Sequence, residues 1–295
     1  MATTFTGTYT ALVTPFVADG SAVDWGAFDR LVEAQIEGGV SGLVPCGSTG
    51  ETPTLRQEEQ REVVRRTVAV ARGRVPVIAG TGTYDTTTTI EESRAALEAG
   101  ATAVMIVMPY YNRPNQEGLF RHVERVAKAV RGPVVLYNIP VRTGVNLEVE
   151  TLLRILDACE NVVGLKDASG NVLYCQALAA AGSRCTVLSG DDALTVPMMS
   201  VGAMGVISVT SNLYPGETSA VTGAMLSGKL REARAMHLRL LPVHSVLFLE
   251  PNPAPIKAAL YAKGRMTAAV RLPLVPPSEG TLRRILSTID AFEGK

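Results

Sequence analysis

The sequence predicts an α/β fold, a (β/α)8 TIM barrel followed by a C-terminal helical appendage, from three observations. Eight short apolar runs rich in Val, Ile and Leu follow one another, and segments with amphipathic helical spacing separate them. The runs lack the polar alternation of half-exposed strands, as expected for a parallel sheet that is covered on both faces. Polar residues collect where the runs end, which is the edge at which such barrels carry their active sites.

The eight expected strands lie within these runs, which are TALVTPF (10–16), GLVPCG (42–47), VPVIAG (75–80), TAVMIVMPY (102–110), PVVLYNIP (133–140), VVGLKDAS (162–169), CTVLSGDD (185–192) and GVISVTS (205–211). A doubly wound open sheet shows the same alternation of strands and helices. It usually has about five or six strands and often a GxGxxG turn, which this sequence lacks. Eight units therefore favour a closed barrel.

The expected helices separate the runs and then continue alone. Clear amphipathic patterns between the runs are FDRLVEAQIE (28–37), EEQREVVRRTVAVA (58–71) and ETLLRILDAC (150–159). After the eighth run the patterns are all helical: KLREARAMHLRLLPVHSVLF (229–248), PAPIKAALYAKG (253–264) and TLRRILSTIDAF (281–292). We therefore expect a catalytic barrel over residues 1–227 and a helical region over residues 228–295.

The composition excludes several kinds of partner. Lys plus Arg and Asp plus Glu are equal, at 28 each, so no net charge favours nucleic acid or an anionic membrane surface. No apolar stretch is long enough to span a bilayer and the start lacks a signal-peptide pattern, so we expect a cytoplasmic protein. The four cysteines show no CxxC pairing, which indicates reduced and mostly buried thiols.

Lys166 is the main candidate for catalysis because it ends an apolar run. Strand alternation places Val162, Gly164 and Lys166 on one face, so the lysine is expected inside the barrel above a glycine that leaves room for it. A lysine in a tight barrel mouth loses hydration, which lowers its pKa and leaves a free amine able to attack carbonyl carbons. The alternative is a lysine that is salt-bridged or that extends to water from the strand end.

Other polar residues lie at neighbouring strand ends. Ser48 and Thr49 stand between glycines in GSTGE, where hydroxyls and backbone N–H groups suit a carboxylate, although the segment can equally be only a turn. Tyr137 ends the fifth run and Arg142 follows in a loop bounded by Pro and Gly. A phenol can relay protons and a guanidinium can hold a carboxylate, but a loop arginine can also be only a solvated surface charge.

The sequence does not indicate a metal site. The three histidines lie on expected helices and no HxH or HExxH spacing occurs, so zinc or iron ligands are missing. Asp191 and Asp192 in SGDD suit a helix cap better than a Mg²⁺ site. We therefore expect no metal.

In four of its motifs the chain resembles the pyruvate-dependent class I aldolase family that contains dihydrodipicolinate synthase and N-acetylneuraminate lyase. GSTGE, YNIPVRTG, GLKDASG and SGDD occur in the family's order, and the similarity extends over nearly the whole length. Within the family, PYYNRP, RTG and EPNPAPIKAAL resemble the synthase branch. The resemblance implies a lyase without an external cofactor, whose lysine forms a Schiff base with pyruvate before condensation with L-aspartate 4-semialdehyde.

The resemblance also implies a role for each site residue. Lys166 carries the Schiff base, and the proton relay is formed by Tyr137, Ser48 and Tyr111, the last of which reaches in from a neighbouring subunit. The pyruvate carboxylate is held by Thr49, the semialdehyde carboxylate by Arg142, and the carbonyls of Gly190 and Ile207 line the pocket. Family members are commonly homotetramers built as dimers of dimers, which is the assembly expected here.

Two departures from the family pattern have consequences. Ser48 stands where threonine is usual, which keeps the hydroxyl but loses the methyl that restricts its rotamers. The lysine-binding positions of inhibited relatives are unmatched at Gln57, Gln60, Tyr84 and Thr88, so we expect weak or absent feedback by lysine. Two other functions stay open: a related aldolase or dehydratase acting on a sugar-derived 2-keto acid, and a non-catalytic barrel that binds a keto acid.

Overall fold

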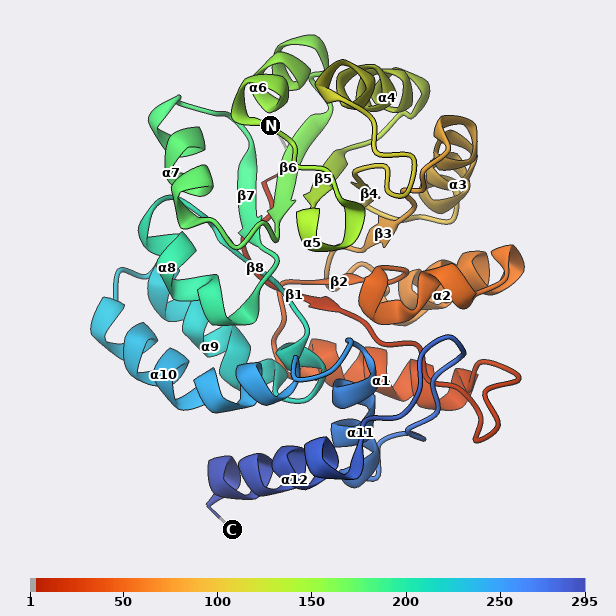
Figure 1. Cartoon of the computed structure of the whole chain (residues 1–295), viewed down its shortest axis with the longest axis vertical. Helices are drawn as coiled ribbons and strands as arrows, with labels where there is room; N and C mark the ends of the chain where they lie inside the picture. The colour runs from red at the N-terminus through yellow and green to blue at the C-terminus, as the bar shows by residue number, and fades with distance from the viewer. Residues whose placement is uncertain (1–3, 295) are drawn as a thin grey trace.

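The computed structural model describes residues 4–294, and within them eight parallel strands form the predicted barrel (Figure 1). The strands are β1 (Gly7–Ala11), β2 (Gly42–Val44), β3 (Ile78–Gly80), β4 (Ala103–Val107), β5 (Val134–Asn138), β6 (Val162–Asp167), β7 (Thr186–Ser189) and β8 (Gly205–Ser208). They pair in the order β2-β1-β8-β7-β6-β5-β4-β3. A parallel bridge between Leu43 and Val77 brings β2 beside β3 and closes the barrel, so the predicted fold class is confirmed.

Helices surround the strands (Figure 1). Those that follow successive strands are α1 (Trp25–Glu37), α2 (Gln57–Ala71), α3 (Thr86–Glu98), α4 (Gln116–Ala129), the short α5 (Pro140–Thr143), α6 (Val149–Ala158), α7 (Val172–Ala180), α8 (Thr195–Ser200) and α9 (Pro215–Leu226). None of the helices described over residues 4–294 is long and apolar enough to cross a membrane. All four cysteines are buried and free, as predicted.

Three further helices end the chain: α10 (Leu230–Val246), α11 (Ala254–Ala262) and α12 (Glu279–Glu293). Helix α10 packs against α9 and α12. Figure 1 shows α10, α11 and α12, in cyan to blue, gathered on one side of the barrel. Helices α10 and α11 lie within the expected segments, and α12 extends beyond its expected segment (281–292) at both ends. The division into two parts at residue 228 stays a prediction.

Two separate apolar clusters fill the fold. One lies between the strands and the helices. The other is the barrel interior, where Tyr9, Ile78, Met105 and Leu188 pack together with Tyr137. Because side chains fill the barrel, space for a ligand is left only at its end, as in other barrels of this type.

The first strand begins earlier than predicted. It covers Gly7–Ala11 rather than the run at residues 10–16. The prediction was displaced because the strand contains threonines, which in sequence resemble loop residues. The hydroxyl of Thr8 lies 2.9 Å from that of Thr222, and Thr10 donates to Gln35 at 2.8 Å. These distant partners satisfy polar groups that would otherwise be costly to bury.

Strand β6 contains a register irregularity that the sequence does not reveal. Val134 pairs with Val162 but Val135 pairs with Gly164, so Val163 is an extra residue on β6. As a result Val162 packs in the outer cluster and Val163 against the barrel interior. The prediction that Val162 shares a face with Lys166 was therefore wrong. Leu165 packs outward in the same outer cluster, so the alternation holds after the irregularity.

Candidate active site

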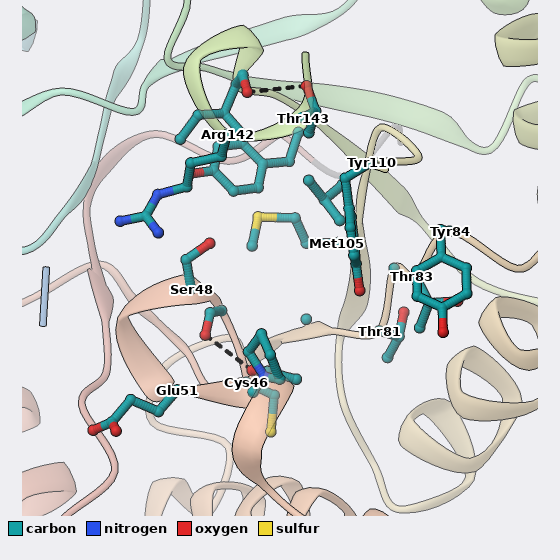
Figure 2. A pocket seen from close by; sticks show the side chains of 18 of the residues that line it. Cys46, Ser48, Glu51, Thr81, Thr83, Tyr84, Met105, Tyr110, Arg142 and Thr143 are labelled. Atoms are coloured by element: carbon teal, nitrogen blue, oxygen red, sulfur yellow. Dashed lines mark hydrogen bonds between the residues drawn. The ribbon is translucent and has the colours of Figure 1, made fainter. Parts of the chain in front are cut away.

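A cavity of about 670 Å³ opens at the carboxyl ends of the strands. Ser48, Tyr137 and Arg142 line it, and Figure 2 shows the Arg142 side chain extending into it near Ser48. These three predicted residues come from different loops and strands, yet the fold brings them to one space. The cavity therefore combines a guanidinium, a phenol and a hydroxyl.

Lys166 lies next to this cavity without being among the residues that line it. Its side chain is buried, and its Nζ is 4.2 Å from the centroid of the Tyr137 ring, which does line the cavity. Burial lowers the pKa of Lys166 to about 7, the Asp192 carboxylate opposes this shift, and Arg142 reinforces it. Within residues 4–294 no carboxylate forms a salt bridge with this amine. At neutral pH a large part of this amine is therefore uncharged, the form that can attack a carbonyl carbon.

Tyr137 is held beside the lysine by the sheet itself, since the two residues are register partners on β5 and β6. Burial raises the pKa of Tyr137 to about 12, while Arg142 and a hydrogen bond with Ser48 oppose the shift. The phenol therefore keeps its proton at neutral pH. With Ser48 as its hydrogen-bond partner it can pass a proton between cavity and strand end.

The GSTGE segment forms a tight turn before α2, which begins at Gln57, one residue before the expected segment 58–71. Ser48 and Thr49 occupy a 3-10 turn, and Thr49 is buried, with its Oγ1 accepting a hydrogen bond from Asn252 Nδ2 at 2.9 Å. Glu51 does not cap the next turn. It forms a buried ion pair with Lys257 at 2.5 Å instead.

Arg142 lies in α5 directly after β5. One of its terminal nitrogens donates to the backbone carbonyl of Asn252 at 3.3 Å, and no carboxylate within residues 4–294 forms a salt bridge with it. The guanidinium is thus available for an anionic ligand in the cavity.

Asn252 is a residue of the site that was not predicted from the sequence. This residue lines the cavity, contacts both Thr49 and Arg142, and has a buried Oδ1 without a hydrogen-bond partner. The only indication in the sequence that Asn252 belongs to the site was its place inside EPNPAPIKAAL, a motif for which no functional role was predicted.

The two aspartates of SGDD differ in function. Asp191 is a cap, as expected, and accepts a hydrogen bond from the N–H of Ala193 at 2.9 Å. Asp192 is not: it is buried and accepts hydrogen bonds from the Ser208 hydroxyl and from the N–H groups of Val209 and Thr210. The interpretation of the pair as a simple cap was therefore wrong for Asp192, whose charge acts on Lys166.

Besides Lys166 and Thr49, three more predicted site residues do not line the cavity. Tyr111 is 91% exposed, whereas its neighbour Tyr110 lines the cavity and packs edge-on against Tyr84. Gly190 lies against Lys166, since a Cβ on it would be 3.1 Å from the lysine Cε, and Ile207 is buried in the barrel interior. Over residues 4–294 no group of three or more His, Cys, Asp or Glu side chains is arranged to hold a metal ion.

Comparisons with known proteins agree with this architecture. Residues 4–292 match the model of the dihydrodipicolinate synthetase family. A 4-hydroxy-tetrahydrodipicolinate synthase of Sorangium cellulosum is 63% identical over 98% of this chain and 96% of its own, and one of Thermomicrobium roseum is 47% identical over 96% and 93%. The solved structure of the synthase of Methylacidiphilum fumariolicum SolV superposes with a TM-score of 0.96 at 43% identity, covering 98% of this chain and 96% of its own. On these matches the chain belongs to the dihydrodipicolinate synthetase family.

Proposed function

We propose that the protein is a Schiff-base lyase that condenses pyruvate with L-aspartate 4-semialdehyde to 4-hydroxy-tetrahydrodipicolinate. The observation that carries the proposal is the unpaired, buried amine of Lys166, with its pKa lowered to about 7, next to a cavity that contains Tyr137 and Arg142. The names of the relatives at 63% and 47% identity support the same reaction.

Lys166 supplies the covalent chemistry, so no external cofactor is needed. Its neutral amine attacks C2 of pyruvate and water leaves, which gives an iminium. Loss of a methyl proton gives an enamine, whose carbon attacks the aldehyde of the semialdehyde. The amino group that came from the semialdehyde then attacks C2 of the former pyruvate and expels the Lys166 amine, which releases the cyclic product.

The surrounding residues move protons and orient the substrates. Tyr137 and Ser48 exchange protons with the reacting oxygens through their hydrogen bond. We assign the pyruvate carboxylate to Thr49 and the GSTGE backbone, and we assign the carbonyls of Gly190 and Ile207 to the deep end of the site beside Lys166. Arg142 holds the carboxylate of the semialdehyde, which a sugar-derived substrate with a polyol chain lacks.

A neighbouring subunit completes the relay in this proposal. Tyr111 is too exposed in a single chain to reach the cavity of its own barrel, and its exposure suits insertion into a second copy. We propose a homotetramer built as a dimer of dimers. The cytoplasmic location expected from the sequence also stays a prediction.

Borohydride trapping tests the proposal. Reduction in the presence of pyruvate should fix the keto acid on the peptide that contains Lys166, as seen by mass spectrometry, and Lys166→Ala should abolish the adduct. A barrel that only binds keto acids gives no adduct in either protein.

Arg142→Ala tests the second substrate. It should lower kcat/KM for the semialdehyde by about 10- to 100-fold, the loss of a charged hydrogen bond, while trapping of pyruvate continues. Equal loss of both steps would remove the reason for assigning a carboxylate-bearing aldehyde.

A further inference from the structure

The Lys257–Glu51 ion pair joins the C-terminal region to the turn that carries Ser48 and Thr49. Both side chains are fully buried, and Nζ lies 2.5 Å from Glu51 Oε1 and 4.1 Å from the centroid of the Phe16 ring. The other oxygen of Glu51 accepts a hydrogen bond from the backbone N–H of Arg271 at 2.9 Å. Both carboxylate oxygens are therefore held by residues of the C-terminal region.

The turn itself has a backbone that needs such support. Cys46 and Glu51 both adopt the left-handed conformation, with φ of 57° and 54°. Residues with a side chain rarely adopt it, and they keep it only where the surrounding structure holds them in place. Ser48 and Thr49 lie between these two residues, so a displacement of Glu51 would shift the backbone that carries the two hydroxyls.

A purely stabilising role explains the pair poorly. Removing two charges from water costs about as much free energy as their attraction returns, so buried ion pairs contribute little net stability. Glu51 lines the cavity, yet Figure 2 shows its carboxylate directed away from Ser48 and Arg142. Its oxygens are already used by protein donors, which leaves the carboxylate no part in binding substrate.

A second contact from the C-terminal region reaches the same turn. Asn252 Nδ2 donates to Thr49 Oγ1 at 2.9 Å, two residues before Glu51. The turn is thus fixed at two points by segments that lie about 200 residues later in the chain.

We propose that Lys257 and Glu51 are positioning residues, which hold the Ser48 hydroxyl against Tyr137 and the Thr49 hydroxyl toward the pyruvate carboxylate. This inference rests on the proposed function, because it assigns a purpose to the geometry of the same site. It makes the C-terminal helical region part of the catalytic unit.

The double variant Glu51→Gln, Lys257→Met tests the positioning role separately from stability. It leaves no isolated charge buried, and Gln keeps an oxygen that accepts the N–H of Arg271, so the protein should fold. We expect kcat to fall and borohydride trapping to slow by about tenfold, with a raised KM for pyruvate, because small displacements of catalytic groups have effects of this size.

A matched control is the Lys263–Glu293 pair, which also lies in the C-terminal region but only partly buried and away from the turn. Lys263→Met with Glu293→Gln should leave kcat, KM and trapping unchanged. Denaturant unfolding of both double variants reports any general loss of stability.

Wild-type values of kcat, KM and trapping rate in the Glu51→Gln, Lys257→Met variant would overturn the inference. If that variant does not fold, Glu51→Asp decides, since it keeps both charges of the pair and shortens the side chain by one methylene: unchanged kinetics contradict the positioning role and slower trapping supports it. Failure of the proposed function looks different, because the wild-type protein itself would then give no pyruvate adduct.

Discussion

Lys166→Met should make the protein more stable while abolishing the pyruvate adduct. The buried amine has its pKa lowered from 10.5 to about 7, so burial costs free energy whenever the amine is charged in the unfolded chain. Methionine fills a similar volume without a charge. Asp192 loses no essential partner, because Ser208, Val209 and Thr210 donate to its carboxylate.

The size of the gain depends on pH in a defined direction. Between the two pKa values the unfolded chain binds more protons than the folded protein, so the wild-type protein becomes more stable as pH rises from 7 to 10. With one pKa unit equal to about 1.4 kcal/mol, the cost of burying Lys166 is about 5 kcal/mol at pH 6 and about 2 kcal/mol at pH 9. The stability advantage of Lys166→Met should shrink accordingly.

Urea unfolding of both proteins at pH 6, 7, 8 and 9 measures this difference. Lys257→Met is the matched control, because this lysine is equally buried but paired with Glu51. Its removal leaves a buried carboxylate without its counter-charge and should lower the free energy of unfolding by about 3–5 kcal/mol. A Lys166→Met protein that is no more stable than wild type at pH 6, or whose advantage grows with pH, would refute the reasoning.

The other predictions concern pH, feedback and the C-terminal region. The trapping rate should rise through pH 7 and level off above pH 8, since about a tenth of Lys166 is neutral at pH 6 and about nine tenths at pH 8; a flat profile contradicts the lowered pKa. L-Lysine should inhibit weakly or not at all, because the resemblance implies a glutamate near Thr88 that pairs with the inhibitor in inhibited relatives, and this chain lacks it; inhibition at micromolar concentration contradicts this. Arg271→Met should lower the free energy of unfolding at pH 7 by about 1–2 kcal/mol, because Arg271 is the main cause, with a smaller contribution from Arg56, of the lowered pKa of Glu59, about 2, and solvent screens part of this attraction. The difference should shrink as pH falls from about 4 to 2, and a loss that is independent of pH would assign it to packing instead.

Most strands could be predicted because a parallel sheet covered on both faces needs continuous apolar runs. The first strand was displaced because its buried threonines find partners more than 200 residues away, at Thr218 and Thr222. The irregularity at Val163 depends on how β6 pairs with β5, which local alternation does not contain.

Prediction from local sequence is also limited for the two buried lysines in and near the site. Lys166 and Lys257 both stand in apolar segments, VVGLKDAS and PIKAAL, and neither segment says whether a carboxylate is near. Glu51 pairs with Lys257 across 206 positions of sequence. For Lys166 the nearest influences are Asp192, already engaged by three donors, and Arg142, which repels its proton.

These different surroundings assign the two lysines opposite roles. Burial lowers the pKa of Lys257 to about 8, but attraction to Glu51 opposes this shift and keeps the amine mostly charged at neutral pH, which suits a fixed ion pair. Burial without a salt bridge favours the neutral form of Lys166, which suits covalent chemistry at a carbonyl carbon. The proposed nucleophile is therefore distinguished by the carboxylate partner that it lacks. Whether a buried lysine has a carboxylate partner depends on the folded arrangement of distant residues. The position of Lys166 at a strand end is enough only to make it a candidate.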